Sequence, residues 1–296
     1  MDSAIAKAAT ALCWSQWGHL GVSASGSTVP ERAIDLEAAL AFLPVVEHLD
    51  RRLFDEAIDW CVQFAGHFTS VSCLKHVLKF FTAEHQRDFA RIAATVNKYG
   101  GTKWPSAKNE AVDVKLSRKS VLRLDKAAAI QLRARKTFGI NARADLITVM
   151  LLENVGVPEG EHRWFKVSGL QDLPYSRRQL SDALQDLKMG GVVGTLEFGT
   201  TRYALRQIAP LRELLAPLPN KRGQPWTQRL ALVAGLLHVE RTTRDKSDVT
   251  RAVDTRNIVE RMRPRFEAVE EAPPHLLGDR TPWLTIADWL VPLLRP

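Results

Sequence analysis

Apolar residues recur every three to four positions through the first 98 residues, which is the spacing of helices that bury one face. The pattern predicts helices over residues 4–14, 34–49, 53–65 and 72–81. In the third of these, the apolar positions on one face are Phe54, Ala57, Ile58, Cys61 and Phe64. We therefore expect residues 1–98 to form a helical N-terminal domain.

A second kind of pattern follows residue 138, where helical and alternating segments mix. Asn141 is a natural N-cap for a helix over 141–153, and a short strand is expected at 162–167. Ser168 with Gln171 matches a capping box that opens a short helix, and Ser176 with Gln179 matches a second one. Two short strands, at 192–198 and 201–205, then surround Gly199 as a hairpin.

The helix predicted over residues 177–189 separates apolar from polar positions. Leu180, Leu184 and Leu187 recur at the spacing of one face, which we expect to be buried. Gly190 and Gly191 then stop the helix. The polar side of the helix therefore remains available to solvent or to a ligand.

This order of helix, strand, two helices and hairpin resembles the winged helix-turn-helix domains of bacterial transcription regulators. The resemblance covers residues 138–206, and it implies a recognition helix that enters the major groove of DNA. The DNA-facing residues that it implies are Ser176, Arg177, Arg178, Ser181, Asp182 and Gln185 on the helix, with Arg202 on the wing. The wing is short and poor in Lys and Arg, in contrast to the wings of many DNA-binding proteins.

Charge is concentrated just before this segment. Residues 100–137 carry 10 basic and 3 acidic residues, a net charge of +7, whereas residues 138–206 are neutral. A basic block favours partners rich in phosphate, because neutralised phosphates release counterions. We expect a basic connecting helix over 115–138, whose phosphate-contacting residues would be Arg118, Lys119, Arg123, Lys126, Arg133, Arg135 and Lys136. The alternative is a solvated basic helix without a partner.

The last third of the chain returns to helical spacing. The pattern predicts a buried helix over residues 226–239 and a long charged helix over residues 249–271. A tail interrupted by prolines follows and contains Trp283 and Trp289. All four of these tryptophans, Trp283, Trp289, Trp164 and Trp226, have apolar neighbours in the sequence, which favours positions in the core. The expected fold is mainly α with a small β-hairpin. It has several domains: a helical region over 1–98, a linker and basic helix over 99–137, a winged helix over 138–206 and a helical region over 207–296.

Composition is that of a globular protein, with 45% hydrophobic and 25% charged residues. No apolar run is long enough to span a bilayer, and the first residues do not match a signal peptide. Three cysteines are too few for a disulfide framework, which favours a reducing compartment and a cytoplasmic location. We expect no membrane association and no cofactor.

The leading functional expectation is a non-enzymatic regulator of transcription that binds double-stranded DNA, alone or as a homodimer. The alternative is an adaptor or antitoxin-like subunit that binds a partner protein.

Two further sequence patterns would indicate an enzyme or a metal site, but both match their motifs poorly. Gly26-Ser27 followed by Asp35 and Glu37 is similar to the motif of nucleotidyltransferases, but the spacing is short and the acidic residues fit the start of a helix. A zinc set of Cys61, His67, Cys73 and His76 matches no usual finger spacing. We expect neither an enzyme nor a metal site.

Overall fold

The computed structural model describes residues 3–22, 30, 32–107, 111–158, 161–170, 173–221 and 224–295. Within these residues the fold consists of 13 α-helices and one two-stranded antiparallel hairpin. The expected fold class, mainly α with a small β-hairpin, is confirmed. None of the described helices is long and apolar enough to cross a membrane.

Six helices are built from the first hundred residues: α1 (Ala4–Leu20), α2 (Leu36–Ala41), α3 (Leu43–Leu49), α4 (Arg51–Phe64), α5 (Val71–Leu78) and α6 (Ala83–Gly100). Five of them begin at a polar N-cap, because a side-chain oxygen can accept a bond from a free backbone N–H of the first turn; the caps are Ser3, Asp35, Asp50, Ser70 and Thr82. The single helix predicted over 34–49 is divided at Phe42, just before Pro44. A short 3₁₀ turn, η1 (Ala65–His67), connects α4 to α5.

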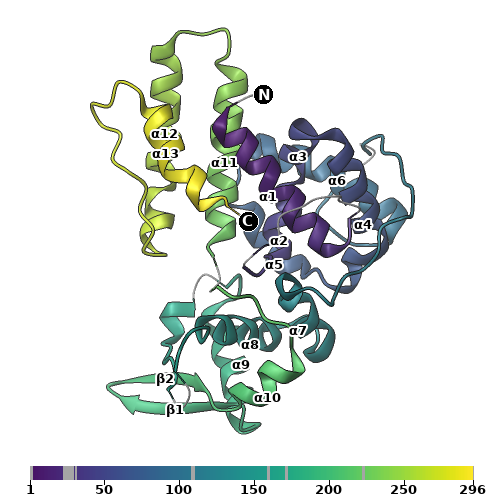
Figure 1. Ribbon diagram of the computed structural model, residues 1–296, viewed down its shortest axis with the longest axis vertical. Coiled ribbons are helices and arrows are strands. Elements are labelled where there is room, and N and C mark those ends of the chain that lie inside the picture. Colours follow the sequence, from purple (N-terminus) through teal and green to yellow (C-terminus); the bar gives the residue numbers. More distant parts are fainter. Residues whose placement is uncertain are drawn as a thin grey trace.

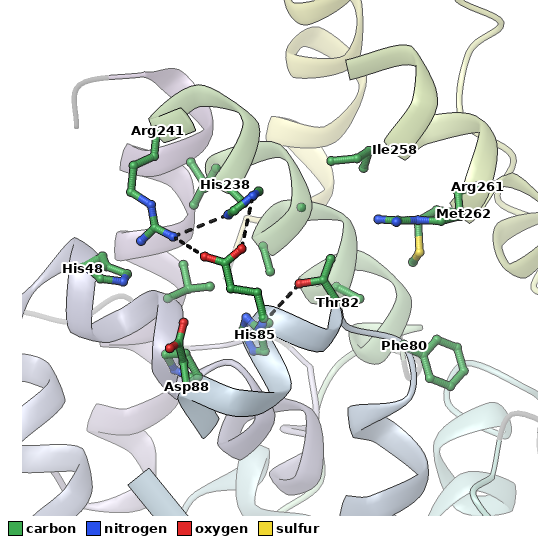
Figure 2. Close-up of a pocket in the computed structure, with 17 residues that line it drawn as sticks. His48, Phe80, Thr82, His85, Asp88, His238, Arg241, Ile258, Arg261 and Met262 are labelled. Carbon is green, nitrogen blue, oxygen red and sulfur yellow. Dashed lines mark hydrogen bonds and ion pairs between the residues drawn. The ribbon is translucent and has the colours of Figure 1, made fainter. Parts of the chain in front are cut away.

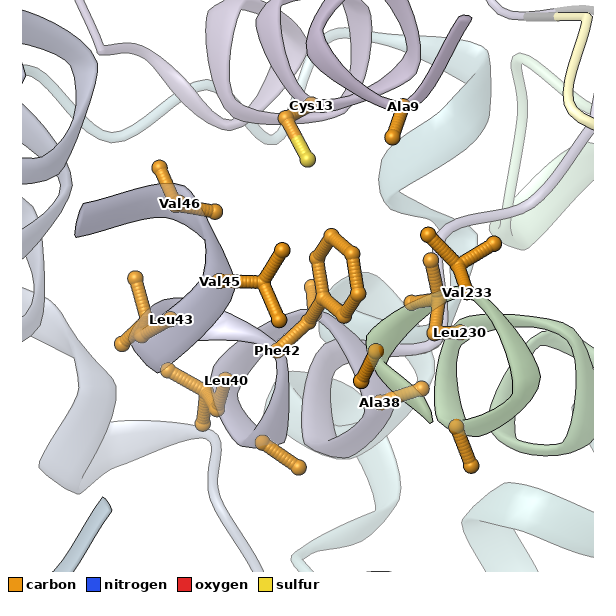
Figure 3. Close-up of a cluster of buried hydrophobic side chains, with 14 of the residues drawn as sticks. Ala9, Cys13, Ala38, Leu40, Phe42, Leu43, Val45, Val46, Leu230 and Val233 are labelled. Atoms are coloured by element: carbon orange, nitrogen blue, oxygen red, sulfur yellow. The ribbon is translucent and has the colours of Figure 1, made fainter. Parts of the chain in front are cut away.

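Three further helices, α11 (Trp226–Thr242), α12 (Asp248–Glu267) and α13 (Pro282–Leu293), follow at the end of the chain (Figure 1). Helices α11 and α13 pack on α1, α11 also packs on α2, and α12 packs on α11 and α13. Figure 3 shows Phe42 between residues of α1 and residues of α11, and the phenyl ring is almost completely buried. The N-terminal and C-terminal segments, which the sequence suggested as separate regions, thus share one hydrophobic core. We call α1–α6 with α11–α13 the helical body.

The remaining elements form a second hydrophobic cluster, which we call the hairpin module (Figure 1). It contains α7 (Ile130–Phe138), α8 (Ala142–Glu153), α9 (Arg177–Met189), α10 (Ile208–Leu214) and the strands β1 (Val193–Phe198) and β2 (Thr200–Leu205), with the 3₁₀ turn η3 (Val167–Leu170) before α9. Phe165 forms an isolated bridge with Tyr203, so the predicted strand at 162–167 is reduced to one paired residue. The predicted order of elements is otherwise observed; Gln171 lies outside the described residues.

The predicted basic helix over 115–138 is wrong in its first half. Residues 111–124 have no regular secondary structure, and only η2 (Ala127–Ala129) and α7 are helical. Val112, Val114 and Leu116 alternate with exposed residues and are buried or half-buried on the helical body. An alternating pattern of this kind favours extended backbone over helix.

A buried carboxylate holds this extended segment in place. Asp59 on α4 is 1% exposed and accepts hydrogen bonds from the backbone N–H of Arg118 at 2.6 Å and of Ser120 at 3.3 Å. The backbone N–H of Val121 donates to Gly21 at the end of α1. The basic residues of the segment are therefore carried on the surface of the helical body.

Candidate nucleic-acid interface

Helix α9 begins with a capping box. The backbone N–H of Gln179 donates to Ser176 Oγ at 3.2 Å, and the backbone N–H of Ser176 donates to Gln179 Oε1 at 2.9 Å, so the predicted capping box is present. One residue earlier, the Tyr175 hydroxyl donates to Asp145 Oδ2 on α8 at 2.7 Å. The turn before α9 and its first residues are thus fixed relative to α8.

The two faces of α9 differ as the sequence predicted. Leu180, Ala183, Leu184 and Leu187 are buried in the hairpin module, with Leu184 completely inaccessible. The residues singled out for DNA contact on this helix are all exposed: Ser176, Arg177, Arg178, Ser181, Asp182 and Gln185. The structure therefore brings all six to one solvent-facing surface.

Opposite charges on this surface are paired only loosely. A guanidinium nitrogen of Arg178 lies 3.8 Å from a carboxylate oxygen of Asp182, and both side chains are largely exposed. Arg143, at the start of α8, lies 3.5 Å from Asp186 on α9. Exposed pairs of this kind contribute about 0–1 kcal/mol, so a phosphate can compete for either arginine.

Two basic residues of this surface were missed from the sequence. Arg143 belongs to a different helix, and only the packing of α8 on α9 brings it beside Asp186. Lys188 is exposed in the last turn of α9, where its positive charge also interacts favourably with the negative end of the helix dipole. Lys188 was recognisable from helical spacing, whereas Arg143 was not.

Arg202, the residue of the hairpin that was expected to contact DNA, is less exposed than the residues of α9 expected to do so. This residue pairs with Leu196 across the two strands and is half-buried; its Nε is buried without a hydrogen-bond partner among the described residues. Trp164, expected in the core, is 41% exposed beside the hairpin, and Leu196 is 45% exposed. The wing therefore presents more apolar than basic surface.

The basic segment divides into exposed and sequestered residues. Arg118, Lys119 and Arg123 are exposed on the extended part, and Lys136 is exposed on α7. Lys126 is half-buried, with its ammonium 3.5 Å from Asp125. These five residues remain candidates for phosphate contact.

Arg133 has to be removed from that set. Its guanidinium donates to the carbonyls of Leu124 at 2.6 Å and Lys126 at 2.5 Å, which precede the hairpin module. It also donates to the carbonyls of Leu215 at 3.0 Å and Pro217, which leave the module. Arg133 therefore joins the two segments that connect the module to the helical body, and its donors are already used.

Arg135 has to be removed as well, because it is buried at 2% exposure between the helical body and the hairpin module. Its guanidinium donates to Glu37 at 2.6 Å, to both oxygens of Asp145 at 2.8 Å and to the Phe68 carbonyl at 2.8 Å. A charge with these partners cannot reach a phosphate. It is a structural link between α2, α7 and α8.

A separate pocket lies in the helical body among α3, α6, α11 and α12 (Figure 2). The carboxylate of Glu84 lies 3.6 Å from His238 Nε2 and 3.8 Å from a guanidinium nitrogen of Arg241. His85 is buried with Nε2 2.7 Å from the Ala41 carbonyl, and burial lowers the pKa of His85 to about 4. Glu84, His238 and Arg241 are thus engaged with one another.

The structure also places residues of the zinc pattern and of the nucleotidyltransferase pattern considered from the sequence. Cys61 and Cys73 are free and buried, as is Cys13, whose pKa burial raises to about 12. Among the described residues no group of three or more His, Cys, Asp or Glu side chains is arranged to hold a metal ion. Gly26 and Ser27 lie outside the described residues, and Asp35 is the N-cap of α2, as the start of a helix requires.

The exposed polar face of α9, fixed by its capping box and by Tyr175, is thus the surface that most closely fits the sequence-based expectation. Comparisons of the chain with protein-family models, with curated proteins and with solved structures give no significant match.

Proposed function

We propose that this protein binds double-stranded DNA through α9 and acts as a regulator of transcription. The observation that carries the proposal is the exposed polar face of α9, which stands on a buried leucine face and follows a short turn. The hairpin that comes after it supports the resemblance to winged helices noted from the sequence.

The side chains on this face have the chemistry for reading DNA. An arginine can donate two parallel hydrogen bonds to guanine O6 and N7, and Gln and Ser can bond base edges or phosphates. Arg177 and Arg178 occupy the first turn of α9, the part of a recognition helix that contacts base edges. Because their side chains are exposed, binding requires no rearrangement of the buried core of the module.

Replacing both Arg177 and Arg178 by alanine tests the proposal. The double variant is expected to lose about 1–3 kcal/mol of binding free energy for each base contact that is removed. Its fold should be unchanged, because both side chains are exposed and neither belongs to the buried leucine face of α9. The measurement is fluorescence anisotropy with a DNA site selected from a random library, with circular dichroism as the check on folding.

A matched control is the double variant Arg244→Ala, Lys246→Ala. These two basic residues are exposed on the connection between α11 and α12, so the same charge is removed from another part of the surface. DNA affinity should be nearly unchanged in the control. If the control and the α9 variant bind DNA equally well, α9 is not the reading helix and the adaptor alternative is favoured.

The basic segment is proposed to supply affinity that is independent of sequence. Charge reversal of Arg118, Lys119 and Arg123 to glutamate should weaken binding to specific and random DNA by similar factors. The slope of log affinity against log salt should fall by about one unit for each phosphate contact that is lost. Titrations over a series of salt concentrations measure this slope directly.

The control for this experiment reverses Lys7, Lys75 and Arg87, which are exposed on α1, α5 and α6. Both triple variants change the net charge equally, so a general electrostatic effect would lower the two slopes together. An equal decrease, or no decrease in either variant, would show that the 118–123 segment makes no local phosphate contact.

A further inference from the structure

A polar cavity lies between the helical body and the hairpin module, bounded by α2, α5, α7, α8 and the start of α11. It has an empty volume of about 460 Å³, its open mouth included. A second hollow of about 510 Å³ shares Asp35, Gln131, Asp145 and Leu173 with it. We call these two adjoining hollows the junction cavity.

The first part of this junction cavity is rich in carboxylates. Asp35, Glu37 and Asp145 line it together with a single guanidinium, that of Arg135. Arg135 is bonded to both Glu37 and Asp145, whereas Asp35 forms no ion pair with any residue in the described part of the chain. Asp35 accepts from the backbone N–H of Ala38 and contacts the Thr227 hydroxyl at 3.5 Å. Burial raises the pKa of Asp35 and of Glu37, and the charge of Arg135 partly lowers both.

An unused polar side chain faces the same space. Gln228, in the first turns of α11, lines the cavity and is only 6% exposed. Its carboxamide makes no hydrogen bond to any described residue. Buried amides almost always have partners, whether protein or water, so this carboxamide offers its hydrogen bonds to whatever occupies the cavity.

The second part of the cavity adds an apolar wall to the polar residues that it shares with the first. Its walls include Ile34 and Trp226 from the helical body with Val149 and Leu152 from α8. A molecule that reached from the carboxylates into this part would place a hydrocarbon or aromatic group against these side chains. Mobile water and simple inorganic ions gain nothing from such walls.

We propose that the junction cavity binds a small organic cation, with a primary amine or guanidinium head and a short apolar body. The head donates to Asp35 and to the carbonyl oxygen of Gln228, near Glu37, and the body lies against Ile34 and Val149. The charge of the head offsets the excess of buried carboxylate. This site is independent of DNA binding by α9.

The test is direct binding of small amines to the whole protein in the absence of DNA. Isothermal titration calorimetry with 2-phenylethylamine should show one site, and thermal melting should shift upward with ligand concentration. Methylamine should bind more weakly, because it lacks the apolar body. The neutral analogue 2-phenylethanol should bind more weakly still, because it cannot offset the carboxylates.

Two variants locate the site. Asp35→Asn keeps an N-cap for α2, and Gln228→Leu removes an unbonded group, so both proteins should fold. Each should weaken 2-phenylethylamine binding by about tenfold or more. Asp125→Asn removes an exposed carboxylate outside the cavity and should bind as tightly as the unaltered protein.

Three results would overturn the proposal: no saturable binding of the amine, equal binding of 2-phenylethanol, or binding that both variants leave unchanged. Saturation of the cavity by Mg²⁺ alone with no competition from the amine would also overturn it. Because no DNA is present, none of these results depends on the role of α9.

Discussion

Replacing Arg135 by methionine is expected to destabilise the protein by about 3–5 kcal/mol, because it leaves two buried carboxylates without their cation. Glu37 and Asp145 are 1% and 3% exposed and belong to the helical body and to the hairpin module, respectively. Methionine fills much of the same volume, so the effect reports the lost charge more than a cavity. Urea denaturation followed by tryptophan fluorescence and circular dichroism measures it.

The loss should depend on pH in a defined direction. Burial raises the pKa of Glu37 in the folded protein and Arg135 partly lowers it, so removing Arg135 raises it further. A carboxyl whose folded pKa lies above its unfolded value contributes stability at low pH and loses it as pH rises through the folded pKa. The Arg135→Met variant should therefore be less destabilised at pH 5 than at pH 8.

The neighbouring variant Lys136→Met is the control for Arg135. Lys136 is exposed on the same helix, and its replacement should change stability by less than about 0.5 kcal/mol at either pH. Equal stabilities for the Arg135 and Lys136 variants would mean that the buried ion cluster is not needed to hold the two parts together.

Leu184→Ala is expected to cost about 2–5 kcal/mol, because it removes a completely buried side chain and leaves a cavity in the hairpin module. DNA affinity should decrease only as far as the folded fraction does, since Leu184 faces away from the exposed surface of α9. The same urea denaturation gives the stability, and anisotropy at low temperature gives the affinity.

Met189→Ala provides the comparison for Leu184, since Met189 is 73% exposed at the end of the same helix. Its expected effect on stability is below about 0.5 kcal/mol. If Leu184→Ala were equally mild, the leucine face of α9 would not be a core face, and the set of exposed residues assigned to DNA would be wrong with it.

The order of elements in the hairpin module was predictable because its signals are local. A capping box spans three residues, Gly190 and Gly191 follow α9 directly, and the leucine face repeats within one helix. Each of these depends on residues that are neighbours in sequence. The exposure of Arg178 followed from the same helical spacing, whereas Arg177 lies two turns before Leu184 and is exposed because it is the first residue of α9.

The roles of Arg133 and Arg135 were not predictable because their partners are remote in sequence. Arg135 bonds Glu37 across 98 positions, and Arg133 bonds Pro217 across 84. Composition assigns both to a basic block, while long-range packing makes them interior links. In contrast, the alternation of Val112 and Val114 was a local signal for extended structure that the high charge of the segment obscured.

Helix α13 was missed for a different reason. Pro282 stands in its first turn, where proline is tolerated, and Pro292 stands near its last residue, so neither interrupts the middle of the helix. The sequence could not reveal that α13 packs on both α1 and α12 and buries Ile286 and Leu290. Contacts between distant segments leave no periodic signature.

The contacts of α1 with α11 and α13 have a consequence for biosynthesis. A chain leaves the ribosome from its N-terminus at about 5–20 residues per second, and domains generally fold as units. The apolar faces of α1 and α2 therefore become covered by α11 only after about 200 further residues, including the whole hairpin module, have been synthesised. During that interval Phe42 and its neighbours lack the cover that α11 gives them in the folded protein.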